Sequence, residues 1–413
     1  MQALRSSMGE GADEDPTEAG GQSKLAVVCR AHKAFAPRTE RAGRVAAALS
    51  DLGWDCTFWP PVQAPTPAVS EKSRPVRRSL RKLSERFVLL DRFEIEGLAW
   101  RSGFERSGPA AGYLVVPNFS PAVTASRVLR AVGRPYVVDT GDPWGMDMPL
   151  GGRGIGPAAR RSRAERDLFG GAAGIVVTTD LQAEEMISRF PEKPVMVRPN
   201  GFQEVDTAPP IEAGRKDPAV LRLAHFGRFD RSVRVGPLPL LEALADSGRW
   251  DRVVMTQFGP DPKELPKSTG RVAIEARAAL PWPEAVAEAR SHDAAIVIGN
   301  RPERRMQMPS KVVEYLSLPI PRIALCSGTD DSLHECAGRL PGYLVLTEAD
   351  RDVADKVASH LGRRWEPEEL EPPEELSWGV VAGEISAFVD SCLRAEISSA
   401  PARPLPGLVG SHP

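Results

Sequence analysis

The amino-acid sequence predicts an α/β protein built from two doubly wound parallel sheets, each covered by helices. Short apolar runs without alternation recur along the chain, which is typical of strands buried on both faces of a parallel sheet. Stretches with helical periodicity separate most of these runs. This alternation of predicted strands and helices stops at segment 204–220, which is rich in proline and charged residues, and then starts again. With about 150 residues per domain, a chain of 413 residues is long enough for two such units.

The first domain is expected over residues 24–203. It opens with the apolar run 25–29, a polar loop over 30–40, an amphipathic helix over 41–53 and a strand over 54–59. This β-α-β order requires parallel strands. Further strands are expected at 112–116, 135–140 and 174–179, with helices at 121–133, 156–170 and 180–190.

The second domain is expected over residues 221–378, after the hinge at 204–220. Its strands are expected at 221–227, 252–259, 271–276, 294–300, 321–327 and 342–347, and its helices at 237–248, 281–292, 309–318 and 351–362. A terminal helix follows over 379–397. The tails 1–23 and 398–413 are expected to be disordered because they are acidic and Gly-rich or Pro-rich.

Composition excludes several classes of protein. The net charge of −2 argues against binding nucleic acid over a broad surface. No run approaches the ~20 apolar residues of a membrane span, and the N-terminus lacks the apolar region of a signal peptide. The five cysteines are odd in number and form no C-x-x-C pair, so we expect a cytoplasmic protein without structural zinc. The D-x-D strings at 13–15 and 350–352 lie in a tail and at a helix start, so no metal site is expected.

Several segments, in order, resemble the landmarks of GT-B-fold nucleotide-sugar glycosyltransferases, and most resemble the retaining group called family 4. They are VVDTGDPWG, AERDLFGGAAGIVVTTDLQAEEM, MVRPNGF, LAHFGRFD and PSKVVEYLSLPIPRIAL. The resemblance covers roughly residues 24–395. It implies a UDP- or GDP-sugar donor bound mainly by the second domain, an acceptor bound mainly by the first, and no cofactor or essential metal. It also implies that the terminal helix packs back on the first domain.

The predicted helix at 309–318 carries the first half of a donor site. Pro309 suits a first helical turn, and the free N–H groups there, with Ser310 and the charge of Lys311, favour a diphosphate. The resemblance implies that Glu314 binds the ribose hydroxyls; a surface role is the alternative. The family often has a second Glu where this chain has Met306. The neighbouring Gln307 offers a hydrogen bond there, but no carboxylate nucleophile.

The loop after the first strand of the second domain carries the other half. Gly227 lets a ligand approach the backbone closely. Arg228, Arg231 and Arg234 follow, and the resemblance implies that such residues bind the donor diphosphate; Arg matches phosphate geometry. A solvated basic loop is the alternative. Trp282 is a candidate for stacking on the base, or for simple packing beside its two prolines.

Two residues of the first domain are candidate catalytic groups, together with Arg228 on the leaving diphosphate. His32 is a candidate acid or base because histidine as a residue type titrates near neutrality; the alternative is a residue of a solvated loop. The resemblance implies that Asp142 lies near the acceptor, where it would orient the hydroxyl; otherwise it caps a turn. The segment 72–87 holds seven basic residues and one acidic residue. It is either a peripheral contact with an anionic inner membrane face or a solvated helix.

The sequence thus predicts a metal-independent glycosyltransferase that moves a sugar from a nucleotide donor to a hydroxyl on a glycan, a lipid-linked or a small-molecule acceptor, with retention. Two alternatives stay open. One is a nucleotide-sugar epimerase on the same fold. The other is a non-catalytic nucleotide-sugar-binding protein, an alternative that stays open because Met306 stands where the family often has a Glu.

Overall fold

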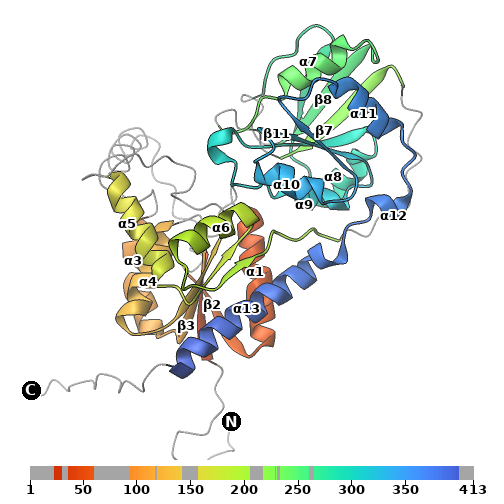
Figure 1. Ribbon diagram of the computed structural model, residues 1–413. Helices are drawn as coiled ribbons and strands as arrows, with labels where there is room; N and C mark the ends of the chain where they lie inside the picture. The colour runs from red at the N-terminus through yellow and green to blue at the C-terminus, as the bar shows by residue number, and fades with distance from the viewer. Residues whose placement is uncertain are drawn as a thin grey trace, which may run out of the picture.

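The computed structural model contains two six-stranded parallel sheets with helices on both faces (Figure 1). The residues described are 23–29, 36–59, 94–116, 119–141, 157–204, 217–227, 229, 233–259 and 265–399. The first sheet has the order β2-β1-β3-β4-β5-β6 and the second β12-β11-β10-β7-β8-β9. Both are the doubly wound sheets that the sequence predicts.

The elements of the first unit have the following bounds. Its strands are β1 (Ser23–Val28), β2 (Trp54–Trp59), β3 (Ala111–Val116), β4 (Tyr136–Thr140), β5 (Gly174–Val177) and β6 (Val195–Val197). Its helices are α1 (Ala36–Asp51), α3 (Glu94–Ser107), α4 (Phe119–Ala131), α5 (Pro157–Gly170), α6 (Asp180–Arg189) and the last of the described helices, α13 (Trp378–Ser399).

The elements of the second unit follow the same alternation. Its strands are β7 (Val220–Phe226), β8 (Arg252–Phe258), β9 (Val272–Arg277), β10 (Ala294–Ile298), β11 (Arg322–Cys326) and β12 (Tyr343–Thr347). Its helices are α7 (Leu238–Asp246), α8 (Trp282–Ala289), α9 (Lys311–Glu314), α10 (Ser332–Gly338), α11 (Val353–Gly362) and α12 (Pro367–Leu370). The 3₁₀ turns are η4 (Pro302–Arg304), η5 (Tyr315–Ser317) and η6 (Glu374–Leu376).

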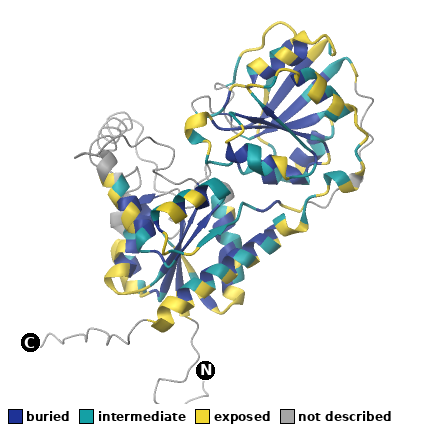
Figure 2. Ribbon diagram, in the orientation of Figure 1, coloured by how far each residue is buried: buried dark blue, intermediate teal, exposed yellow. Residues whose placement is uncertain are grey.

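The central strands of each sheet are buried on both faces, as the unalternating apolar runs predict, whereas the edge strands β2 and β9 are partly exposed (Figure 2). In β1, Ala26 and Val28 face a core beneath α4, while Leu25 and Val27 face a second core beneath α1 and α13. Helix α13 contributes Trp378 and an apolar stripe to this second core. The end of the chain therefore completes the first unit, although it follows the second one in sequence.

A buried ion pair ties the carboxyl edge of the first sheet together. The Arg41 guanidinium lies 2.8 Å from the Asp139 carboxylate at the end of β4, and both are almost fully buried. The Tyr113 hydroxyl donates to the same carboxylate at 2.5 Å; burial and the Asp139 charge raise the pKa of this phenol well above its usual range. Arg41 also donates to the carbonyls of Arg198 and Pro199. Asp139 therefore holds the fold rather than facing an acceptor.

A second buried guanidinium organises the other unit. Arg322, at the start of β11, is completely buried. It donates to backbone carbonyls of the η5 region, of the turn before β12, and of α12: Tyr315, Leu316, Leu318, Pro341 and Leu370. Burial lowers its pKa to about 10, so it stays charged at neutral pH, and carbonyl dipoles satisfy the charge that desolvation penalises.

Two of the expected elements have a boundary that differs from the structure by more than three residues. Helix α1 starts at Ala36 and not at residue 41, because Pro37 is tolerated in a first turn; the predicted loop is shorter and Arg38 is helical. The predicted helix at 309–318 is one α turn followed by η5. The Arg322 guanidinium donates to the Tyr315 carbonyl in η5, and the Tyr343 hydroxyl donates to the Val312 carbonyl in α9. The sequence interpretation also missed helices α3, α10 and α12.

The chain crosses between the units twice, and the two crossings run side by side. The Phe202 amide donates to the Leu376 carbonyl at 2.9 Å, and the Trp378 amide donates to the Phe202 carbonyl at 3.3 Å. This pairing joins the end of the first unit to the start of α13. The expected hinge (204–220) and the basic segment 72–87 lie largely or wholly outside the described residues, so both stay predictions. Among the helices described, none has the length and apolarity to cross a membrane.

We expect Asp139→Ala to destabilise the protein by about 3–5 kcal/mol, because it leaves the Arg41 charge buried and unpaired. Urea unfolding followed by tryptophan fluorescence measures this loss. The control is Glu105→Ala, which removes the exposed Arg101–Glu105 pair and should cost under about 1 kcal/mol. Equal midpoints for the two variants would contradict a structural role for the buried pair.

Candidate functional site

The strand order of the second sheet reverses between β7 and β10, and we call the carboxyl edge of the sheet at this point the crevice. Starting from β7, the chain adds β8 and β9 on one side and then β10, β11 and β12 on the other. Ligands of such sheets bind at the carboxyl ends of the strands where the order reverses. Here β7 ends at Phe226 and continues into Gly227, while β10 ends at Ile298 and continues into Gly299 and Asn300.

Gly227 is required by the side chain that lies across it. Its φ of 114° is in the left-handed region. A Cβ at this position would lie 2.1 Å from Cε and 2.6 Å from Nζ of Lys311. The Gly227 amide donates to the Phe258 carbonyl at 2.7 Å, and the Gln257 amide group donates to the Gly227 carbonyl at 2.5 Å. Hydrogen bonds at both the amide and the carbonyl of Gly227 therefore fix the turn in a conformation that leaves space for the Lys311 side chain.

Lys311 lies in an electrostatic environment suited to an anion. Burial lowers the pKa of its ammonium; Glu314, one turn along α9, raises it, and the Arg234 guanidinium lowers it further. Because the pKa of Lys311 is lowered overall, its surroundings stabilise the positive charge less well than water does. An anion placed between Lys311 and Arg234 would raise this pKa again and would be bound in return.

Arg234 is held at the same crevice by Asn300. It donates to the Asn300 side-chain oxygen at 2.9 Å and to the Ile298 carbonyl at 3.2 Å. The Asn300 side chain, nearly fully buried, donates in turn to the Gln307 carbonyl at 2.5 Å. The Asn300 side chain thus connects the loop that carries Arg234 to the loop that leads into α9. The sequence interpretation missed Asn300, although a polar residue directly after a buried strand was the available signal.

Tyr315 anchors α9 to the glycine turn. Its hydroxyl accepts from the Phe226 amide at 2.6 Å and donates to the Phe226 carbonyl at 3.0 Å. Trp282 stacks on Tyr315, with ring centroids 6.4 Å apart, and lies edge-on to Phe226. This favours the packing interpretation of Trp282, and its contact with a base stays a prediction. Glu314, Ser310 and Gln307 are half-buried on the same segment.

The structure therefore brings together six of the predicted donor residues: Gly227, Arg234, Gln307, Ser310, Lys311 and Glu314. The positive charge at these residues has a different basis from the one predicted. Because α9 is one turn long, side-chain cations rather than a helix dipole carry the positive charge. Arg228, Arg231, His32 and Asp142 lie outside the described residues, and their roles stay predictions.

A cation also lies at the corresponding point of the first sheet, where the strand order reverses between β1 and β3. Arg38 Nη1 donates to the carbonyl of Val116, the last residue of β3, at 2.6 Å. A Cβ on Gly141, just after β4, would lie 2.8 Å from the same Nη1. The Arg38 guanidinium is therefore packed at the carboxyl edge of the sheet, directly beside the residue that precedes Asp142.

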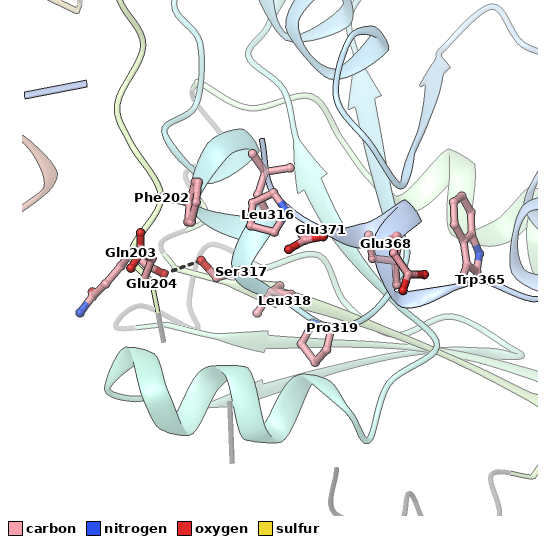
Figure 3. Close-up of a pocket in the computed structure, with 12 residues that line it drawn as sticks. Phe202, Gln203, Glu204, Leu316, Ser317, Leu318, Pro319, Trp365, Glu368 and Glu371 are labelled. Atoms are coloured by element: carbon pink, nitrogen blue, oxygen red, sulfur yellow. Dashed lines mark hydrogen bonds between the residues drawn. The ribbon is translucent and has the colours of Figure 1, made fainter. Parts of the chain in front are cut away.

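A separate pocket of about 680 Å³ lies beside the two crossings (Figure 3). The first crossing contributes Phe202, Gln203 and Glu204, and η5 contributes Ser317, whose hydroxyl donates to the Gln203 carbonyl at 2.7 Å. The rest of the wall comes from the segments around η5 and α12: Leu316, Leu318, Pro319, Trp365, Glu368, Leu370, Glu371 and Pro372. Its ionisable residues are all acidic, which distinguishes it from the cationic crevice.

No family profile matches the chain, and no curated protein matches it. Solved structures do. The N-terminal domain of Candida albicans trehalose-6-phosphate phosphatase matches with a TM-score of 0.60 and 13% identity, over 92% of this chain and 98% of that one. Staphylococcus aureus MnaA with UDP matches with 0.53 and 12%, over 92% and 99%. The lipopolysaccharide outer core galactosyltransferase WaaB matches with 0.52 and 14%, over 89% and 99%. The chain has the two-domain GT-B fold that the sequence predicts.

Gly227→Ala should displace Lys311 and weaken the binding of pyrophosphate, a minimal diphosphate, by about tenfold or more, as loss of a charge-assisted contact does. Calorimetry measures this. The matched control is Gly133→Ala, where φ is also positive, at 69°, but the added Cβ meets no atom within 4 Å. It bears the same kind of backbone strain without touching the crevice, so equal affinities of the two variants would count against the site.

Proposed function

We propose that this chain is a metal-independent glycosyltransferase that moves a sugar from a UDP- or GDP-sugar donor to a hydroxyl acceptor, with retention. The observation that carries the proposal is the Lys311 ammonium lying across Gly227, with Arg234 close to it at the crevice between β7 and β10. Two cations beside an open glycine turn suit the diphosphate of a nucleotide-sugar.

The same arrangement suits the chemistry of transfer. When the bond to the sugar breaks, negative charge grows on the leaving nucleoside diphosphate. Lys311 and Arg234 are already positioned before the reaction, by Gly227 and by Asn300 respectively, so little reorganisation is needed to stabilise that charge. Arg228 and Arg231 would add to this field from the adjoining loop. These cations take the role that a divalent metal has in other transferases.

The remaining donor contacts are assigned by position. Glu314 follows Lys311 by one turn, and a carboxylate accepts hydrogen bonds from two ribose hydroxyls. Gln307 and Ser310 lie on the segment that leads into α9 and would contact the diphosphate or the sugar. Met306 offers no carboxylate, so no covalent glycosyl intermediate is assigned to that position.

The acceptor is proposed to bind at the carboxyl edge of the first sheet. Asp142 follows Gly141 there and would orient the acceptor hydroxyl, and His32 would act as an acid or base. The Asp139 carboxylate is already bound to Arg41 and Tyr113 and is not available to an acceptor.

Incubation with a panel of UDP- and GDP-sugars tests the proposal against both alternatives. A transferase hydrolyses its donor slowly and transfers the sugar when an acceptor is added. An epimerase converts the donor to an isomer while the nucleotide stays attached. A binding protein changes neither. Epimerisation without release of nucleoside diphosphate, or tight binding with no turnover, would refute transfer.

We expect Glu314→Ala to weaken nucleoside diphosphate binding by about 1–3 kcal/mol, because a charged partner of the ribose is lost. Calorimetry with UDP and GDP measures the change. Glu303→Ala is the control, because Glu303 is exposed on η4 and should leave the affinity unchanged. Wild-type affinity in a folded Glu314→Ala protein would remove this residue from the site.

Activity should survive EDTA, since side-chain cations stabilise the leaving group. Turnover in excess EDTA is compared with turnover in added Mg²⁺ or Mn²⁺, and the rates are expected to agree within about twofold, since no metal provides transition-state stabilisation. Abolition by the chelator and rescue by a metal would show that the cation argument is wrong.

A further inference from the structure

Gln182, on the first turn of α6, lies buried where the two units meet. Its side chain is completely shielded from solvent. Its Nε2 donates to the Met306 carbonyl of the second unit at 2.7 Å and to the Gly141 carbonyl of the first unit at 3.0 Å. Its Oε1 accepts from the Thr178 amide at 3.0 Å and from the Thr178 hydroxyl at 3.2 Å. One amide group thus contacts both units.

The orientation of this amide is fixed by its neighbours. Two carbonyl oxygens face Nε2 and need a donor, whereas a backbone N–H faces Oε1 and needs an acceptor. Both hydrogens of the amide and both acceptor sites of its oxygen are therefore used. No other side chain of this length supplies two donors and an acceptor in this way, so the contact is specific for glutamine.

The two carbonyls belong to the two halves of the proposed reaction site. Gly141 precedes Asp142 at the end of β4, and Met306 lies on the loop that leads to Lys311. The Thr179 hydroxyl also donates to the Met306 carbonyl, at 3.4 Å. Beside this contact, Arg339 and Asp180 form an exposed ion pair at 3.0 Å across the same boundary; its exposure makes its contribution small.

We propose that Gln182 is a positioning residue that clasps the two units together and sets the acceptor edge against the donor loop. The clasp itself rests on geometry, and its effect on transfer rests on the proposed function. Its hydrogen bonds can be exchanged for bonds to water, so the closed arrangement is reversible and lets substrates enter. The covalent crossings at Phe202 and Ser377 remain paired in either state and act as the hinge.

Gln182→Glu tests the clasp with a nearly isosteric change. A carboxylate would face the carbonyl oxygens of Gly141 and Met306, and the repulsion should part the units. Small-angle X-ray scattering without ligand is expected to give a larger radius of gyration than the wild type. The charge-matched control is Ser359→Glu, because Ser359 is exposed on α11 within the second unit; this variant should scatter like the wild type.

Kinetics separate positioning from general destabilisation. Asn300 still ties Gln307 within the second unit, so the affinity of Gln182→Glu for UDP or GDP should change by less than about threefold. Its kcat should fall by about tenfold or more, because the acceptor edge is no longer held against the donor. A purely structural role would lower the urea midpoint without this split between binding and turnover.

Gln182→Met keeps the length of the side chain but removes its donors without adding charge, so it decides the matter if Gln182→Glu does not fold. The clasp predicts a larger radius of gyration and a lower kcat for this variant too. Wild-type scattering and kcat in Gln182→Met would overturn it, as would a loss of stability with kcat unchanged. If the wild type transfers no sugar at all, the proposed function fails, but the scattering comparison still tests the clasp.

Discussion

The hydrogen bonds of the Arg322 guanidinium are the interaction on which most of the second unit depends. A buried charge is tolerated only where polar groups replace its water, and here backbone carbonyls do so. They belong to the turn that ends the α9 segment and to α12, which leads to the second crossing. The need to satisfy one buried cation therefore shapes both the α9 segment and the connection between the units.

The consequences extend from this turn to the proposed donor site. Because the Tyr315 carbonyl is held by Arg322, the Tyr315 ring is held where its hydroxyl reaches the backbone of Phe226. Phe226 precedes Gly227, and the turn there accommodates Lys311. The cationic crevice is thus supported by buried bonds before any ligand arrives, which is the preorganisation that stabilisation of a leaving anion requires.

The first unit also contains a buried guanidinium whose charge needs polar partners, but here the main partner is a carboxylate. Arg41 is neutralised by a carboxylate, and its other donors hold the carbonyls that lead into the first crossing. These bonds hold the carboxyl edge of the first sheet in place where the chain leaves it. Among the residues that the structure describes, the two units are joined by the paired crossings at Phe202, by the bonds around Gln182 and by the exposed Arg339–Asp180 pair. Two units that are each held by buried bonds, and are joined at the crossings, suit the proposed site, which is divided between the carboxyl edges of the two sheets.

The sequence by itself determined the number of units, the parallel sheets and their burial on both faces, because apolar runs and helical periodicity are local properties of the chain. It also singled out Gly227 and Lys311, because each residue type has a limited set of uses, and the structure brings the two residues side by side; their binding of a diphosphate stays a proposal. Only the tertiary structure decided what Gln182, Asn300, Asp139 and Arg322 do. Their partners are mostly distant in sequence, and no local pattern specifies which carbonyl or carboxylate a buried polar group will meet. The shortening of the helix after Pro309 has the same cause, since its final carbonyls bind a guanidinium from the next strand.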